Sequence, residues 1–165
     1  MATNPMPIAG DDILSIIHDD HQRVDALFAD YAAAPDKGAK LEIVREVYRQ
    51  LLPHAQAEEE IFYPALAAAS GNDDAVEEAF GEHAAAKKTL ESILAASPAD
   101  LTYDMKVRML QREIQHHVRE EETELFAEAR DAGLDLDALG RRFVERKAEL
   151  APLFEQQLDS AGSGR

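Results

Sequence analysis

Six polar residues recur in two copies of one pattern, and their side chains are of the kinds that bind metal ions. Each copy has a single histidine and then, 33 or 34 residues later, a His-x-x-x-Glu motif. A spacing of four puts the His and the Glu on the same helical face, one turn apart. Imidazole and carboxylate groups together suit first-row transition metals. The pattern therefore predicts a metal site. Its candidate ligands are His21, His54, Glu58, His83, His117 and Glu121.

The number of candidate ligands favours two metal ions over one. Zinc normally takes three or four ligands in a tetrahedral shell, so six inward groups are too many for one such ion. Two irons fit better, each with two histidines and with Glu58 and Glu121 bridging them. An oxo or hydroxo bridge could add a fifth ligand and still leave a position open for a small molecule. The alternative is a metal-free core, in which hydrogen bonds satisfy the histidines and both carboxyl groups have raised pKa values.

These ligands must be positioned by helices, and the hydrophobic periodicity predicts an all-α chain. Apolar residues recur with a period near 3.6, and no segment alternates strictly. In all four ligand-bearing segments, the candidate ligands lie on the apolar face. The expected helices are 11–34, 39–69, 74–96 and 101–132. Because the connections are short, neighbouring helices should be antiparallel, which predicts an up-down-up-down four-helix bundle.

The bundle should span residues 11–132, and the rest of the chain is expected to lie outside it. Residues 133–159 form an additional amphipathic C-terminal helix, which could cap the bundle or make a dimer contact, so the protein could be a monomer or a homodimer. Residues 1–10 are expected to be a flexible N-terminus, and residues 160–165 a disordered tail.

Composition excludes several function classes. The net charge of −16 argues against nucleic acid, because phosphate binding needs clustered Lys and Arg. The absence of cysteine excludes disulfides and thiolate-held metals. No stretch approaches the roughly 18 apolar residues of a membrane-spanning helix, and no secretory signal is apparent. We therefore expect a cytoplasmic protein that binds neither nucleic acid nor membranes.

The motifs resemble the hemerythrin-like HHE cation-binding domain family. The resemblance covers about residues 11–130 and rests on four blocks. They are Asp20-His21, His54-x3-Glu58-Glu59 with Tyr63-Pro64, Glu82-His83, and His117-x3-Glu121-Glu122 with Leu125-Phe126. The resemblance implies a four-helix bundle around a non-haem di-iron centre, with the six candidate ligands holding the irons.

The chain departs from the oxygen-carrying members of that family. They have a His-x-x-x-His motif on the third helix, where this chain has Lys87 in place of the second histidine, and His-x4-Asp on the fourth helix. The four-histidine, two-glutamate set is instead similar to iron-centre-repair proteins and iron-sensing domains. The resemblance thus favours a di-iron protein that handles O2, peroxide or NO, with or without enzymatic turnover. Iron storage, sensing or donation, or reversible O2 binding, is the alternative.

Several other polar residues near the motifs allow more than one interpretation. Lys87 could point its amine at the open coordination side, but a lysine whose stem covers apolar surface is the preferred interpretation. Tyr63 could donate a hydrogen bond near the metals, although a packed aromatic is the preferred role. His18 has an intermediate position and could support the ligands, whereas His116 lies on a solvated face. One or two of the glutamates beside the motifs could orient the histidines.

Overall fold

The computed structural model describes residues 11–162, and within that range the chain is helical and contains no strand. The all-α prediction is therefore confirmed for these residues. The predicted flexible segment 1–10 lies outside them. The long helices are α1 (Ile13–Ala33), α2 (Lys37–Ala57), α4 (Asp73–Ala95), α5 (Tyr103–Glu120) and α7 (Leu136–Gly162).

Two of the long helices continue without a break through a π-helical turn. Helix α2 passes through η1 (Glu58–Phe62) into α3 (Tyr63–Ser70), and α5 passes through η2 (Glu121–Leu125) into α6 (Phe126–Asp131). Each π turn begins at the glutamate of a His-x-x-x-Glu motif. Hydrophobic periodicity predicted a regular helix there, because one extra residue per turn leaves too weak a sequence signal. Isolated π turns in α-helices are frequent at functional sites.

Local capping explains where several helices start and stop. The side chains of Asp12, Asp36 and Asn72 accept hydrogen bonds from backbone N–H groups three residues ahead, at the starts of α1, α2 and α4. These residues satisfy donors that have no partner inside the helix. Gly71 ends α3 with a φ of 71°, a left-handed conformation that glycine adopts without steric cost.

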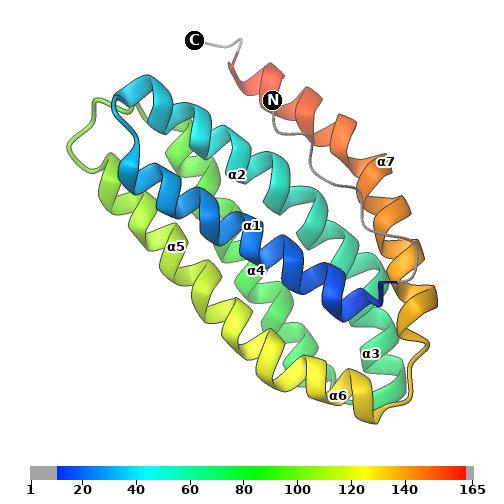
Figure 1. The fold of residues 1–165 in the computed structure, drawn as a ribbon. Coiled ribbons are helices and arrows are strands. Elements are labelled where there is room, and N and C mark those ends of the chain that lie inside the picture. Colours follow the sequence, from blue (N-terminus) through cyan, green and yellow to red (C-terminus); the bar gives the residue numbers. More distant parts are fainter. Residues whose placement is uncertain (1–10, 163–165) are drawn as a thin grey trace.

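Helices α1, α2, α4 and α5 lie side by side and run in alternating directions (Figure 1). Helix α7, orange to red in the figure, covers α1 and α2 on their outer side. It runs to Gly162, so residues 160–162, expected to be part of a disordered tail, are helical. Gly140 permits a close approach between α7 and the start of α1, because a Cβ there would lie 2.7 Å from the carbonyl oxygen of Asp11.

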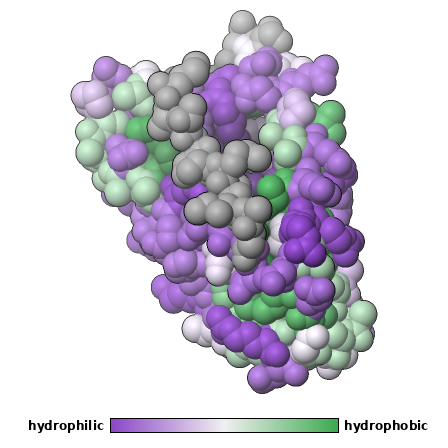
Figure 2. All heavy atoms as spheres, turned by 45° about the vertical axis from the view of Figure 1, so that its right-hand side comes forward, coloured by the Kyte–Doolittle hydropathy of each residue, from purple (hydrophilic) through white to green (hydrophobic). Residues whose placement is uncertain are grey.

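The surface reflects the acidic composition of the chain. The face on which α7 comes forward is mostly hydrophilic, with hydrophobic residues in separate groups (Figure 2). None of the helices between residues 11 and 162 combines the length and the apolar character needed to cross a membrane.

Candidate metal centre

The six predicted ligands meet in the middle of the bundle, and we call them the inner cluster. Glu58 and Glu121 are 0 % and 1 % exposed, and the four histidine side chains are at most 10 % exposed. An ionised carboxylate in such an interior is costly unless a cation or several hydrogen-bond donors accompany it. The structure therefore brings together every residue that the repeat selected. The inner cluster comprises His21, His54, Glu58, His83, His117 and Glu121.

The two glutamates divide the inner cluster into two halves, and each glutamate reaches both. The carboxylate of Glu58 has one oxygen 2.9 Å from His54 Nε2 and the other 3.1 Å from His83 Nε2. Glu121 has one oxygen 3.3 Å from His21 Nε2 and the other 3.4 Å from His117 Nε2. Each half therefore holds two imidazoles and one oxygen from each carboxylate. Each carboxylate is therefore shared between the two halves.

The donor atoms fit metal binding. Metal bonds of about 2.1 Å at angles of 90–110° place two ligand atoms about 3.0–3.4 Å apart, close to the separations observed here. The ligand atoms of each half lie within 4.8 Å of one another. In the half that contains His21 and His54, three buried atoms lie close to one another or to His54 Nε2 without forming a well-aligned hydrogen bond: His21 Nε2, Glu58 Oε1 and Glu121 Oε1. A cation in contact with all three would remove that unfavourable state.

The π turns explain how Tyr63 joins the glutamates. In η1 the backbone N–H of Tyr63 donates to the carbonyl of Glu58, five residues back, and Phe126 and Glu121 are related in the same way in η2. Five residues of regular α-helix would turn the two side chains well apart, whereas a π turn brings them onto one face. Tyr63 consequently lies beside the inner cluster, where an uninterrupted α-helix would not have placed it.

The hydroxyl of Tyr63 occupies the half that contains His83 and His117. It donates to Glu121 Oε2 and lies 3.2 Å from Glu58 Oε2, 3.2 Å from His83 Nε2 and 3.3 Å from His117 Nε2. The ring is fully buried, so Tyr63 also packs as the sequence suggested. Packing alone does not describe it, because its oxygen contacts ligand atoms from both motifs.

Four further carboxylates, which we call the outer carboxylates, hold the four histidines from behind. Each accepts a hydrogen bond from the Nδ1–H of one imidazole at 2.9 Å and thereby aims its Nε2 at the inner cluster. Each histidine is held by a residue from a neighbouring helical segment. The pairs are His54–Asp20, His83–Glu59, His117–Glu82 and His21–Glu122.

These four pairs form a closed ring around the bundle. A carboxylate of α1 holds the histidine of α2, and a carboxylate of η1 holds the histidine of α4. A carboxylate of α4 holds the histidine of α5, and a carboxylate of η2 holds the histidine of α1, which closes the ring. The sequence suggested such a role for one or two glutamates beside the motifs, and Glu59 and Glu122 have it. It missed the role of Asp20 and Glu82. The available signal was that every ligand-bearing segment has an acidic residue directly beside a candidate ligand.

The surrounding carboxylates change the ionisation of the inner cluster. Burial lowers the pKa of His54, but Glu58 and Asp20 more than offset it and raise the pKa to about 9. The same balance raises the pKa of His83 to about 8 and that of His117 to about 10. In return, the imidazoles outweigh burial and lower the pKa of both central carboxyl groups. The raised carboxyl pKa values that the metal-free alternative assumed are thus wrong, and the carboxylates favour positive charge in this interior.

Helix α7 also supports the site, a role that the sequence did not assign to it. Lys147 donates to Asp20 Oδ2 at 2.5 Å, and Arg23 donates to the other oxygen of Asp20 at 2.8 Å. The ring of Phe143 packs edge-on against His54, with centroids 5.7 Å apart. Both α7 contacts lie behind the half that contains His21 and His54.

The remaining predicted residues lie at the edge of the site. His18 donates to Glu122 at 2.8 Å, the same carboxylate oxygen that holds His21. His116 stays outside the inner cluster and contacts Glu82. Lys87 is exposed and lines a surface groove instead of the inner cluster, in keeping with a lysine whose stem covers apolar surface.

A small cavity lies against the inner cluster. It measures about 30 Å³ and is lined by all four histidines together with apolar side chains that include Val24 and Ile114. A water molecule needs at least about 10–15 Å³ by this measure, so the cavity can hold roughly two waters or one diatomic molecule.

The geometry agrees with comparisons to known proteins. Residues 12–129 match the family described as "Hemerythrin HHE cation binding domain". This chain belongs to the hemerythrin HHE family. The match includes all six inner-cluster residues and all four outer carboxylates. It stops short of α7, so the contacts of Lys147 and Phe143 come from a helix outside the matched region.

A curated relative of this HHE protein comes from Nostoc sp. (strain PCC 7120) and is called "DNA nickase". It is 35% identical to this chain over 119 residues. The aligned region is 72% of this chain and 34% of the relative, so the chain spans about a third of that protein's length. No solved structure matches the chain.

Neutralising one outer carboxylate of the HHE site should weaken metal binding. In Glu59→Gln, the amide can no longer provide a negatively charged acceptor for His83 Nδ1–H. Loss of such partners typically costs 10–100-fold in metal affinity. We expect a loss in that range, measured by competition with a chromogenic chelator. Glu60→Gln is the matched control, because Glu60 pairs with Arg146 at the surface and contacts no ligand. Equal affinities in the two variants would contradict the positioning role.

Proposed function

We propose that this chain binds two iron ions at the inner cluster and uses the pair to react with O2, peroxide or NO. The observation that carries the proposal is the division of the cluster by Glu58 and Glu121, each of which offers one oxygen to each pair of histidines. Membership of a cation-binding family supports a metal in this place. When bound, such a pair would supply two redox-active centres linked by carboxylates.

The charge around the cluster supports two ions instead of one. Two central and four outer carboxyl groups surround the four imidazoles, and among the lysines and arginines of residues 11–162 only Lys147 and Arg23 pair directly with any of them. With neutral imidazole ligands, the six carboxylates and these two cations leave four negative charges. One divalent ion would compensate half of them, whereas two divalent ions would compensate all of them. Imidazole and carboxylate ligands together suit iron, and the lack of thiolates removes the softer alternatives.

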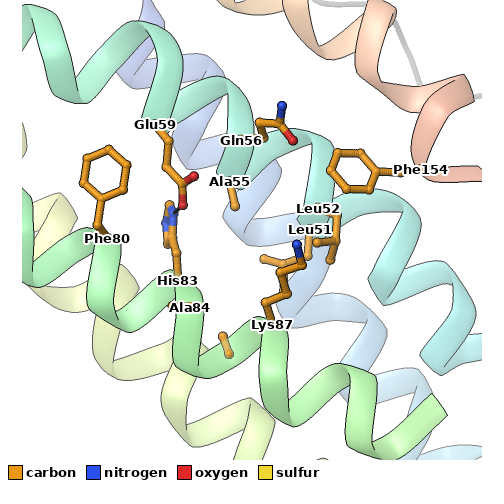
Figure 3. Close-up of a pocket in the computed structure, with 11 residues that line it drawn as sticks. Leu51, Leu52, Ala55, Gln56, Glu59, Phe80, His83, Ala84, Lys87 and Phe154 are labelled. Carbon is orange, nitrogen blue, oxygen red and sulfur yellow. Dashed lines mark hydrogen bonds and ion pairs between the residues drawn. The ribbon is translucent and has the colours of Figure 1, made fainter. Parts of the chain in front are cut away.

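The cavity and a neighbouring groove offer a small molecule a route to the histidines. The groove, about 270 Å³, lies between α2, α4 and α7 and is shown in Figure 3. Leu51, His83 and Ala86 line both the groove and the cavity, so the two spaces are neighbours. Lys87 extends across the groove toward Leu51 (Figure 3). The largely apolar side chains that line the groove and the cavity suit a small, weakly polar molecule.

We do not extend the name of the Nostoc relative to this chain. A DNA-cleaving activity requires contact with a phosphate backbone, which a net charge of −16 opposes. The relative is also about twice as long, so its activity is a property of a larger protein.

The proposal is tested by loading the protein with iron under anaerobic conditions and measuring its iron content and spectrum. We expect about two irons per chain. On exposure to O2, peroxide or NO, we expect a new near-ultraviolet or visible band that forms at a rate proportional to the concentration of the added molecule. Glu58→Gln is the control, because it should bind little iron and show no such band.

Two results would overturn this function. Retention of one iron or none by the wild-type chain would remove the di-iron pair. If the protein held two irons but neither bound nor changed O2, peroxide or NO, its role would be to store or donate iron. Consumption of peroxide or NO over many cycles would identify an enzyme, and reversible O2 uptake would identify a carrier. Both results would uphold a reactive pair.

A plasmid-nicking assay of the iron-loaded protein tests the activity named for the relative, and it should give no cleavage.

A further inference from the structure

A second group of metal-binding side chains lies on the surface formed by α4 and α5, outside the inner cluster. It consists of Glu82, His116 and Glu120, and we call it the outer triad. His116 Nε2 is 3.2 Å from Glu82 Oε2 and 3.2 Å from Glu120 Oε1. The three ligand atoms all lie within 4.8 Å of one another.

His116 Nε2 faces two carboxylate oxygens with at most one N–H group. A neutral imidazole has one N–H group, so His116 Nε2 cannot donate a full-strength bond to both carboxylates. A metal bound with bonds of about 2.1 Å would hold one nitrogen and two oxygens about 3.0–3.4 Å apart, which matches both contacts. The side chain of His116 is 55% exposed and that of Glu120 is 38% exposed, so water could complete the coordination shell.

The outer triad is joined to the inner cluster through a single carboxylate. One oxygen of Glu82 faces His116, while the other accepts the Nδ1–H of His117 at 2.9 Å. Glu82 also lines the cavity beside the four histidines. The hydrogen bond from His117 fixes the orientation of Glu82, so one of the three donors is already held in place for a cation.

A similar position elsewhere in the bundle lacks the third donor. His18 contacts Glu122, which also holds His21, just as His116 contacts Glu82, which also holds His117. No second carboxylate completes a group at His18 among residues 11–162. Two features distinguish the outer triad. Glu120 lies one helical turn beyond His116, and Glu82 uses separate oxygens for His116 and His117, whereas His18 and His21 share one oxygen of Glu122.

We propose that the outer triad is a separate binding site for a divalent first-row transition-metal ion. One imidazole and two carboxylates form a donor set suited to Mn²⁺, Fe²⁺, Co²⁺ or Zn²⁺. The ion binds Glu82 Oε2, His116 Nε2 and Glu120 Oε1. A cation there withdraws electron density from the carboxylate that holds His117, so occupancy of the outer triad modulates a ligand of the inner cluster.

The test measures Co²⁺ binding by iron-loaded protein, by equilibrium dialysis followed by elemental analysis of cobalt and iron. We expect one Co²⁺ per chain beyond the iron, at unchanged iron content. His116→Ala and Glu120→Gln should lose this Co²⁺, and His18→Ala should keep it. The three altered side chains are at the surface, so the variants should fold, which circular dichroism checks.

The same dialysis with Glu58→Gln separates this inference from the proposed function. That variant should lack the iron pair and still bind one Co²⁺ that His116→Ala removes. The outer triad would be rejected if wild-type protein bound no more Co²⁺ than His116→Ala. It would also be rejected if His18→Ala lost as much Co²⁺ as His116→Ala, because Co²⁺ would then bind to surface histidines in general.

Discussion

Replacing Glu58 by glutamine is expected to empty both halves of the inner cluster. The carboxylate of Glu58 contributes one oxygen to each half, so its charge is lost to both metal positions at once. Outer partners of metal ligands are already worth 10–100-fold in affinity, so a bridging ligand should cost more than about 100-fold. Elemental analysis of Glu58→Gln should therefore find far less than the two ions per chain expected for the wild type.

A histidine variant provides the contrast. His54 contributes a nitrogen to one half only, so His54→Ala should retain about one ion per chain. Melting curves in the presence of a chelator compare the folding of the metal-free proteins. If Glu58→Gln retained as much metal as His54→Ala, the carboxylate would serve one ion and the bridging arrangement would be wrong.

The second large effect is expected at Phe143, in the helix that lies outside the family match. Its ring is fully buried and packs edge-on against His54. Truncating a buried phenylalanine to alanine typically costs about 3–5 kcal/mol. In a chain of this size, such a loss lowers the Tm by roughly 6–20 °C. Because His54 loses the ring that fixes its orientation, Phe143→Ala should also weaken binding in the His21–His54 half.

Phe154 is the matched control, since it lies on the same helix, is 6% exposed and packs against Tyr48 instead of a metal ligand. Phe154→Ala should lose comparable stability, measured by thermal or urea denaturation, and keep its metal content. An equal loss of metal from both variants would mean that α7 acts through overall stability. Normal metal content in Phe143→Ala would show that the ring contact does not orient His54.

The inner cluster could be predicted from sequence because it depends on regular spacing. His54 and Glu58, like His117 and Glu121, share a helical face by their four-residue separation. Tyr63 could not be assigned with the same rule, because the π turn that starts at Glu58 alters the register of every residue after it. Periodicity averaged over a long segment does not detect one extra residue.

The supporting contacts were harder to predict for a different reason. The hydrogen bond between Asp20 and His54, and the contact of Lys147 with Asp20, join residues that are 34 and 127 positions apart. A single sequence contains no spacing rule that pairs residues so far apart. The sequence left open whether residues 133–159 cap the bundle or form a dimer contact, and the structure packs α7 against α1 and α2. The acidic residues beside each ligand were visible, but only the fold shows which histidine each one holds.

The closed ring of outer carboxylates makes the site a test of complete assembly. Each ligand-bearing segment both presents a histidine and holds the histidine of a neighbour. A chain with one segment displaced would therefore lose the orientation of two imidazoles, the one on that segment and the one that the segment holds. High-affinity metal binding would then be confined to molecules whose four segments have all docked. Metal content could accordingly report the fraction of correctly folded chains in a preparation.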